Sequence, residues 1–423
     1  MNFAAQDNTQ PNLSADLPAG QAGAGNTTTV PTPVSTTSSS PTPTKQLTTD
    51  TQVDNSAKNA TAPTESGQAS TKDGITDDVQ YLEELVAKTT LPDTLKTEAQ
   101  RMITRVKRVT QATGFSQEYE LVRKYVEWIT RLPWGKYTTD NFDLNNAKSV
   151  LDTTHHGLEK VKDRILEYLA TMRIKQQKGE QVPRAPIFLF VGLQGIGKTT
   201  MAKAMAQALG RQFIRISLGA MGAITELRGV PKTEIDAEPG QIVKALVSTE
   251  TFNPVILLDE LDKASAKEGT RTDIMAALLE ILDPEQNVAF RDHYLDYPID
   301  LSKVMFVCTA NNLGTISTAL LDRLEVIRFF SYSDDEKTVI AKQYLLPRVF
   351  ERTGLSSETI EFTDDAWPVI VRPLGYDAGV RQLERNIESI CRKAAKLIVE
   401  GKIQKVVINA ENVKQFIQES GVI

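Results

Sequence analysis

Cysteine is nearly absent from this sequence, and its scarcity excludes two kinds of site. The 423 residues include two cysteines, Cys308 and Cys391, which stand far apart in apolar surroundings. Two such residues cannot form a disulfide framework or supply the closely spaced ligands of a zinc site. Because free thiols persist in a reducing compartment, we expect the protein to be cytoplasmic.

The sequence also lacks an excess of positive charge, a long apolar run and a signal sequence. Its 48 basic and 54 acidic residues give a formal net charge of −6, which provides no general attraction to nucleic acid or anionic lipid. No stretch approaches the roughly 18 consecutive apolar residues of a membrane span. The N-terminus has no basic segment followed by an apolar one. We therefore expect a soluble protein with no membrane partner, and nucleic acid is not indicated as a ligand.

Residues 1–76 have almost no aromatic or large apolar side chains. Phe3 is the only aromatic residue there, and Thr, Ser, Pro, Asn, Gln, Ala and Gly dominate. Such a segment cannot bury enough apolar surface to offset the entropy lost on ordering, so we expect a disordered tail. A spacer is the simplest role for it, and a tether or a partner-binding segment is the alternative.

The remaining residues predict an α/β fold between two helical segments. Apolar residues recur at helical spacing over 77–135, which indicates a small helical bundle, and a further helix is expected over about 157–178. Apolar runs at 187–191, 213–216, 255–258 and 304–307 alternate with short helices over 136–331, which is typical of a parallel sheet covered on both sides. After about Ser331 we expect helices without strands, and residues 332–423 form a helical domain.

A phosphate-binding loop follows the first strand. Gly192 to Thr199 fits the pattern G-x-x-x-x-G-K-[ST], with a strand before it and a helix after it. Glycines allow backbone N–H groups to cradle a β-phosphate near a helix N-terminus. Lys198 is expected to reach the β- and γ-phosphates, and the Thr199 hydroxyl to bind Mg²⁺. The expected nucleotide-binding residues are Gly192, Leu193, Gln194, Gly195, Ile196, Gly197, Lys198, Thr199, Thr200 and Asp259.

Two adjacent carboxylates end the strand at 255–258. Asp259 is placed to support Mg²⁺, and Glu260 to orient and activate the attacking water. A pair of acids after a strand is often only a solvated strand end. Because a phosphate loop lies upstream, the pattern here favours catalysis, and we expect ATP to be hydrolysed as well as bound.

Several longer stretches resemble the ATPase module of the Lon protease family (endopeptidase La), within the AAA+ class. The resemblance covers about residues 77–423, and motifs of this length are specific. It implies an AAA+ domain with a C-terminal helical lid over 332–423. The matching stretches are residues 132–137, 157–162, 215–219, 282–287, 292–295, 320–328 and 379–385.

The resemblance assigns roles to three further residues. Asn311 matches the sensor 1 residue, which helps to hold the attacking water. Arg323 matches the arginine finger, which reaches the ATP of a neighbouring subunit and contributes roughly 10³–10⁵ in rate. Arg381 matches the sensor 2 arginine of the lid. A finger used between subunits implies a homo-oligomeric ring, a hexamer in this family. Without the motif context, each arginine would be read as an ordinary surface cation.

Two histidines precede the expected helix at 157–178. His155 and His156 stand where the adenine-side segment of the family begins, and the family usually has tyrosine in place of His156. Stacking on adenine and a solvated loop position are both open for His156.

One departure from the family concerns the central-pore loop. The family has an aromatic-hydrophobic pair that grips unfolded polypeptide, whereas residues 233–240 carry Glu234, Ile235, Asp236 and Glu238. Hydrated carboxylates repel acidic substrates, and apolar rings are the usual basis of a non-specific grip. We therefore expect protein substrates to include a preference for basic segments, and threading by the family mechanism is in doubt.

A second departure is that the sequence ends at Ile423, where the family's Ser–Lys proteolytic domain would follow. No Ser-Ala-Gly segment occurs in these residues. Two origins stay open: a fragment of an ATP-dependent protease, or a Lon-like ATPase without peptidase activity. We expect an ATPase that unfolds or remodels proteins, and the alternative is a switch that binds ATP and regulates a partner without threading it.

Overall fold

The computed structural model describes residues 70–113, 117–179, 185–234, 236–264, 271–372 and 379–417. The disordered tail expected over residues 1–76 lies outside the described residues as far as residue 69. Helix α1 (Ser70–Lys88) begins seven residues before the expected helical segment. Among the described residues, no helix is both long and apolar enough to cross a lipid bilayer.

A parallel five-stranded sheet is at the centre of the α/β segment. Its order is β2-β3-β6-β1-β7, and every neighbouring pair of strands is parallel. The four expected strands are confirmed, and β7 adds a fifth beside β1 that was not expected, because only two of its five residues are buried. The strands are β1 (Ile187–Val191), β2 (Phe213–Ser217), β3 (Val255–Asp259), β6 (Met305–Ala310) and β7 (Leu324–Arg328).

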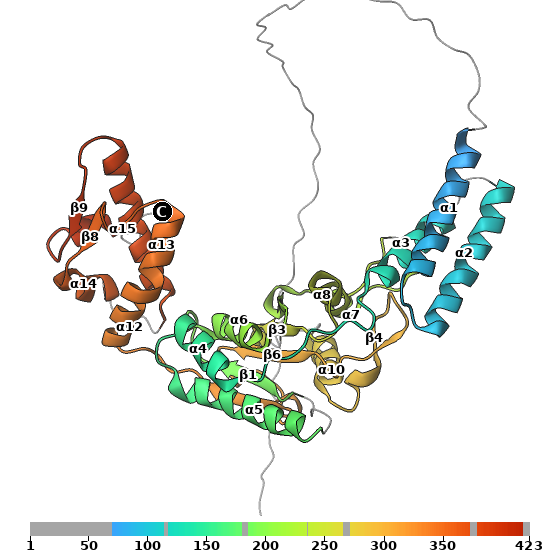
Figure 1. The fold of residues 1–423 in the computed structure, drawn as a ribbon, viewed down its shortest axis with the longest axis horizontal. Helices are drawn as coiled ribbons and strands as arrows, with labels where there is room; N and C mark the ends of the chain where they lie inside the picture. Colours follow the sequence, from blue (N-terminus) through green and yellow to red (C-terminus); the bar gives the residue numbers. More distant parts are fainter. Residues whose placement is uncertain are drawn as a thin grey trace, which may run out of the picture. The chain divides into compact units, whose positions relative to one another are not determined.

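The central strands are buried on both faces because two separate cores lie against them. Along β1, Leu189 belongs to one buried cluster, whereas Phe188 and Phe190 belong to the other. This alternation follows from the two-residue period of a strand. One face is covered by α4 (Leu144–Thr154), α5 (Glu159–Gln177) and α6 (Lys198–Leu209), and the other by α8 (Gln241–Thr249) and α10 (Arg271–Leu282) (Figure 1).

Short elements connect the strands on the second face. They are η1 (Leu218–Ala220), α7 (Ile224–Arg228), α9 (Leu261–Ala264), η2 (Asn287–Ala289), the antiparallel pair β4 (Phe290–Arg291) and β5 (Pro298–Ile299), and α11 (Thr318–Leu321). Helix α4 was not expected, because its Asn and Thr residues have weak helix propensity. Its start is fixed by Asp143, whose carboxylate accepts a hydrogen bond from Asn145 N.

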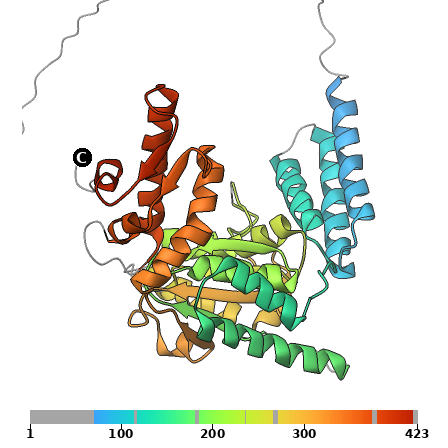
Figure 2. The same cartoon turned by 60° about the vertical axis from the view of Figure 1, so that its left-hand side comes forward.

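The N-terminal helices form the expected bundle. Helices α1, α2 (Asp93–Thr113) and α3 (Gln117–Arg131) lie side by side, coloured blue to teal in Figure 2. Their buried residues, such as Leu82 and Val126, belong to the same apolar cluster as the second face of the sheet. The bundle is therefore packed onto the α/β segment through a shared core.

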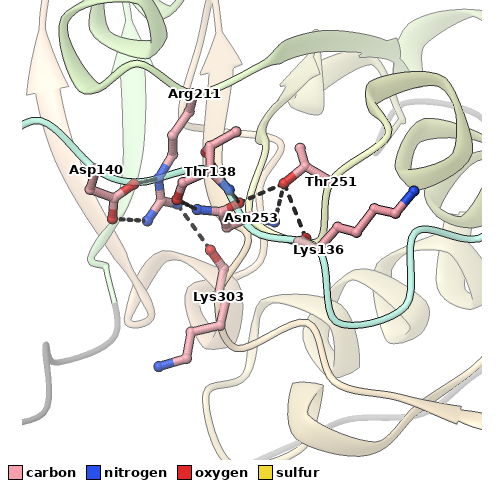
Figure 3. A network of polar contacts seen from close by, with 7 residues as sticks. All are labelled: Lys136, Thr138, Asp140, Arg211, Thr251, Asn253 and Lys303. Atoms are coloured by element: carbon pink, nitrogen blue, oxygen red, sulfur yellow. Dashed lines mark hydrogen bonds and ion pairs between the residues drawn. The ribbon is translucent and has the colours of Figure 1, made fainter. Parts of the chain in front are cut away.

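A short strap after α3 joins the bundle to the α/β segment (Figure 3). The amide of Asn253 binds both the N–H and the C=O of Thr138, at 2.8 Å each. The guanidinium group of Arg211 donates two hydrogen bonds of 2.6 Å to Asp140 and one of 2.9 Å to Lys303 O. These contacts hold residues 136–141 in one register, so the strap is a fixed connection.

The C-terminal segment is the expected helical domain with one difference. Strands β8 (Ile360–Phe362) and β9 (Val406–Ile408) pair in parallel, although strands were not expected after Ser331. Each strand has three residues, and the pairing joins distant segments, so no local pattern indicates it. The helical elements are α12 (Asp334–Ile340), one π-helical turn η3 (Ala341–Leu345), α13 (Leu346–Thr353), η4 (Asp364–Ala366), α14 (Trp367–Val371), α15 (Arg381–Val399) and α16 (Val413–Phe416).

Candidate nucleotide-binding site

The phosphate loop connects the carboxyl end of β1 to the first turn of α6. Gly197 precedes α6 with φ of 97°, and Gly195 has φ of 76°, a left-handed region that glycine adopts without strain. A Cβ atom on Gly195 would also lie 3.0 Å from Arg381 Cβ. Glycine at this position therefore allows both the turn and the close approach of the lid.

Lys198 points back across the loop. Its ammonium group donates hydrogen bonds to Gly192 O, to Leu193 O at 2.9 Å and to Asn311 Oδ1 at 2.9 Å. Burial lowers the pKa of Lys198, and the nearby Asp259 carboxylate opposes that shift. The cation is thus close to the expected sensor 1 residue and to the acidic pair.

The acidic pair is held by neighbouring strands. Asp259 Oδ2 accepts a 2.6 Å hydrogen bond from Arg215 Nε, and Asp259 Oδ1 accepts one from the Thr309 hydroxyl. The same hydroxyl accepts from Glu260 N at 3.0 Å. Glu260 has φ of 63°, and its carboxylate pairs with Lys263 at 2.7 Å. Thr309, on β6, therefore positions both acids although the sequence did not single it out.

His155 lies behind the start of α6. It is buried, with Nε2 at 2.8 Å from Thr200 Oγ1 and Nδ1 at 2.9 Å from Thr154 Oγ1. Because Thr200 donates its proton to Gly197 O at 2.9 Å, it accepts from Nε2. Burial lowers the pKa of His155 to about 4, and the charges of Lys162 and Arg348 add to that shift. The imidazole is neutral near pH 7.

The C-terminal domain closes against the phosphate loop. Val380 N donates a 2.9 Å hydrogen bond to Gly195 O. A Cβ atom on Gly379 would lie 2.5 Å from Gln194 O, so only glycine permits this approach. Tyr332 adds a third contact, since its hydroxyl donates to Ile196 O at 3.0 Å.

These groups line one cavity of about 280 Å³. From the expected set, it brings together Gln194, Gly195, Gly197, Lys198, Thr199, Thr200, Asp259, Glu260, Asn311 and Arg381. Both His155 and His156 also line it. Lining residues that sequence reasoning did not assign include Arg215, Thr309, Tyr332, Tyr344 and Arg348. Most of these have no motif of their own, because packing of the lid brings them to the cavity.

The remaining expected residues lie off the cavity lining. Gly192 and Ile196 shape the loop behind it, and Leu193 is exposed to solvent. Arg323 Nη2 and Nε donate to Asp283 Oδ2 at 2.9 and 3.2 Å. The expected finger therefore does not reach the cavity of its own chain.

The donors around Asp259 fit a Mg²⁺ ion that is bound mainly through nucleotide and water. The Thr199 hydroxyl and the Asp259 carboxylate, the two groups expected to hold the ion, both line the cavity. The described residues contain no group of three or more His, Cys, Asp or Glu side chains that could hold a metal. Mg²⁺ commonly takes one or two protein oxygens together with phosphates and water.

The acidic loop comprises the described residues 231–234 and 236–239, and Ile235 lies outside the described residues. The side chains of Glu234, Asp236 and Glu238 are exposed. Glu238 pairs with Lys244 at 2.5 Å, which offsets its charge. No ion pair is found for Glu234 or Asp236 within the described part of the chain.

Comparison with known proteins agrees with this geometry. Residues 188–332 match the ATPase family associated with various cellular activities (AAA), and residues 351–407 match the Lon protease AAA+ ATPase lid domain. Similar proteins include a Lon protease of Dictyoglomus thermophilum, 46% identical over 341 residues, and Lon protease 1 of Bacillus subtilis, 43% identical over 347 residues.

These alignments cover 80% and 82% of this chain. The chain in turn spans 42% and 43% of the length of the two relatives. The two family models, over residues 188–332 and 351–407, include most of the residues that line the nucleotide cavity. On this evidence, the ATPase and lid segments of the chain belong to the Lon protease family of AAA+ proteins.

Proposed function

We propose that this chain binds ATP with Mg²⁺ in the cavity between the phosphate loop and the lid, and hydrolyses it. One observation carries the proposal: phosphate-binding, acidic and sensor residues from four separate segments line the same cavity. Its volume of about 280 Å³ is just below the usual range for ligand sites, roughly 300–1,000 Å³, and residues of the lid such as Arg381 line it.

Each side chain has a role that its position supports. Lys198 exchanges the loop carbonyls for the β- and γ-phosphates, and Asn311 stays beside it to orient the attacking water. Glu260 takes a proton from that water after turning from Lys263. A bound Mg²⁺, held by Thr199 and Asp259, would neutralise phosphate charge.

The lid and the finger complete the proposed site. Arg381 lines the cavity from the first turn of α15, where it contacts the nucleotide and transmits its state to the lid. Arg323 serves the nucleotide of a neighbouring copy, which requires a homo-oligomeric ring, a hexamer by resemblance to the family. A cytoplasmic location is part of the proposal, because Cys308 and Cys391 are free thiols, as is usual in a reducing compartment.

We further propose that the ring does mechanical work on proteins, with basic segments preferred at the acidic loop. Peptidase activity is not part of the proposal for these 423 residues. The exposed carboxylates of Glu234 and Asp236 favour one rival, a non-threading switch in which ATP binding regulates a partner.

Steady-state ATP hydrolysis by the purified chain, with and without an unfolded basic protein, tests both readings. Glu260→Gln provides the blank, because the amide cannot accept a proton from water. Glu361→Gln, the same change on the lid surface, is the matched control. Hydrolysis abolished by Glu260→Gln alone and stimulated by the unfolded protein supports the remodelling ATPase. A rate of hydrolysis that does not change when the unfolded protein is added favours the switch. A rate equal to that of Glu260→Gln, in a preparation that forms rings, contradicts the proposed ATPase activity.

A further inference from the structure

Lys232 stands at the base of the acidic loop, two residues before Glu234. Its ammonium group lies 3.2 Å from Glu98 Oε1, and 27% of the side chain is exposed. The same nitrogen is 4.5 Å from the centre of the Tyr125 ring, within the range of a cation–π contact. Both partners belong to the N-terminal bundle, with Glu98 on α2 and Tyr125 on α3.

Tyr125 is itself fixed. The ring is buried, its hydroxyl donates to Leu295 O at 3.2 Å, and it packs against Tyr294 with centroids 6.1 Å apart. A buried ring bonded at its far end has little freedom to follow a moving lysine. The position of Lys232 is therefore set by the bundle.

The second end of the loop is tied to the same region. Asp292 is fully buried, and its Oδ2 accepts a 2.7 Å hydrogen bond from Gly240 N. Its Oδ1 accepts from Tyr294 N and Leu295 N at 2.9 and 3.1 Å. Tyr125 thus contacts the two residues whose amides bind Asp292, so both ends of the acidic loop converge on one group of side chains.

The ends of the loop are also joined across its base. Val230 N donates to Glu238 O at 3.0 Å, and Glu234 N donates to Pro231 O at 2.9 Å. A movement at Lys232 would therefore be passed through main-chain hydrogen bonds to the residues that carry the acidic side chains.

Glu98 has an electrostatic effect as well. A lysine two residues from Glu234 could fold back and neutralise the loop, which would cancel part of the negative charge. Because the ammonium group of Lys232 donates to Glu98 of the bundle instead, the negative charges of Glu234 and Asp236 are not neutralised by it.

We propose that Lys232 is a positioning residue that holds the acidic loop against the N-terminal bundle through its contacts with Glu98 and Tyr125. The bundle then sets both the direction of the loop and its net charge. The strap at residues 136–141 supports this coupling, because Asn253 and Arg211 of the α/β segment hold the strap in place through hydrogen bonds (Figure 3). The expected effect on protein substrates rests on the proposed function, whereas the placement of the loop does not.

A probe on the loop measures this placement directly. Thr233 is exposed, and Thr233→Cys offers one accessible thiol, since Cys308 and Cys391 are buried and burial raises the pKa of each to about 12. A fluorophore on Cys at position 233 of the full chain reports loop mobility as anisotropy. The variants are Lys232→Met, Glu98→Gln and the exchanged pair Lys232→Glu with Glu98→Lys. Lys405→Met, which removes a surface ion pair with Glu361 in the lid, is the matched control.

Lys232→Met and Glu98→Gln are expected to lower the anisotropy with little change in melting temperature, and the exchanged pair to restore part of it. For Glu98→Gln, the half-saturating concentration of a basic unfolded protein for ATPase stimulation is expected to rise about two- to tenfold, because the released ammonium group of Lys232 can then neutralise the loop. Basal hydrolysis is expected to stay unchanged.

Unchanged anisotropy in both single variants would overturn the proposal. Lower anisotropy with unchanged stimulation of the ATPase by a basic protein would support the positioning role of Lys232. It would contradict the proposal that the acidic loop contacts protein substrates. A loss of anisotropy in Lys405→Met as large as that in Lys232→Met would also overturn the proposal, because the effect would then be non-specific.

Discussion

The guanidinium group of Arg323 is bound by the carboxylate of Asp283 in its own chain. Two nitrogens donate to one carboxylate oxygen, and Nη1 also donates to Ala319 O at 2.7 Å. Asp283 has a lowered pKa because Glu285 N and Arg323 both donate to it. About a third of the Arg323 side chain is exposed, so the group is held in place and accessible from outside the chain.

Arg323→Ala is expected to reduce the turnover of ATP by roughly 10³-fold or more while leaving ATP binding intact. The reason is that Arg323 does not line the cavity of its own chain and, by the proposal above, acts on a neighbouring copy. Hydrolysis and nucleotide affinity are to be measured separately. Mixing Arg323→Ala with Glu260→Gln subunits should recover activity, since some sites then combine a complete acid pair with an intact finger. No recovery in mixed rings would argue against action between subunits.

Thr309→Val is expected to lower both stability and hydrolysis. The buried hydroxyl serves Asp259 Oδ1 and Glu260 N, and its loss leaves two groups without a partner. This should reduce the free energy of unfolding by about 1–3 kcal/mol, and a displaced Glu260 should slow hydrolysis by about tenfold or more. Urea unfolding and steady-state ATPase measure the two effects. Thr309→Ser keeps the hydroxyl and should retain both properties; equal losses in the two variants would contradict this role.

His155 is expected to make the protein less stable in mild acid. Its pKa is lowered from 6.5 to about 4 in the folded chain. Protons then bind preferentially to the unfolded chain, so the contribution is complete above pH 6.5 and is lost as the pH falls towards 4. The loss is at most about 3 kcal/mol.

Unfolding measured from pH 7.5 to 4.5 tests this dependence. His155→Asn should flatten that part of the profile, whereas His156→Asn leaves the buried imidazole in place and should not. A profile unchanged by His155→Asn would contradict the assignment.

Glu234→Tyr is expected to increase stimulation of the ATPase by an unfolded protein of low net charge. An aromatic ring gains apolar contact with any chain, whereas a carboxylate stays hydrated and favours basic segments. Glu234→Gln removes the charge without adding a ring. It should therefore weaken the preference for a basic protein without increasing apolar contact with the substrate. If neither variant changes stimulation in the presence or absence of salt, the loop does not contact substrate.

The sequence was sufficient for the parts of the site that local chemistry dictates. The run from Ile187 to Thr199 predicts strand, turn and helix in order, because glycines at fixed positions are needed for the left-handed turn. The acidic pair after β3 was predicted from the strand that it ends, whereas the role of Asn311 after β6 was implied by the family resemblance. All three line the cavity because parallel strands end together at one edge of the sheet. Strands β1, β2, β3 and β6 were likewise predicted from their apolar runs.

Only the tertiary structure decided which distant residues meet. Lys232 contacts Glu98 and Tyr125, and Val380 of the lid binds Gly195. No local sequence pattern encodes these pairings. The three-residue strands β8 and β9 escaped prediction for the same reason. Local periodicity records which face of an element is buried, whereas the partner of that face is chosen by packing over the whole chain.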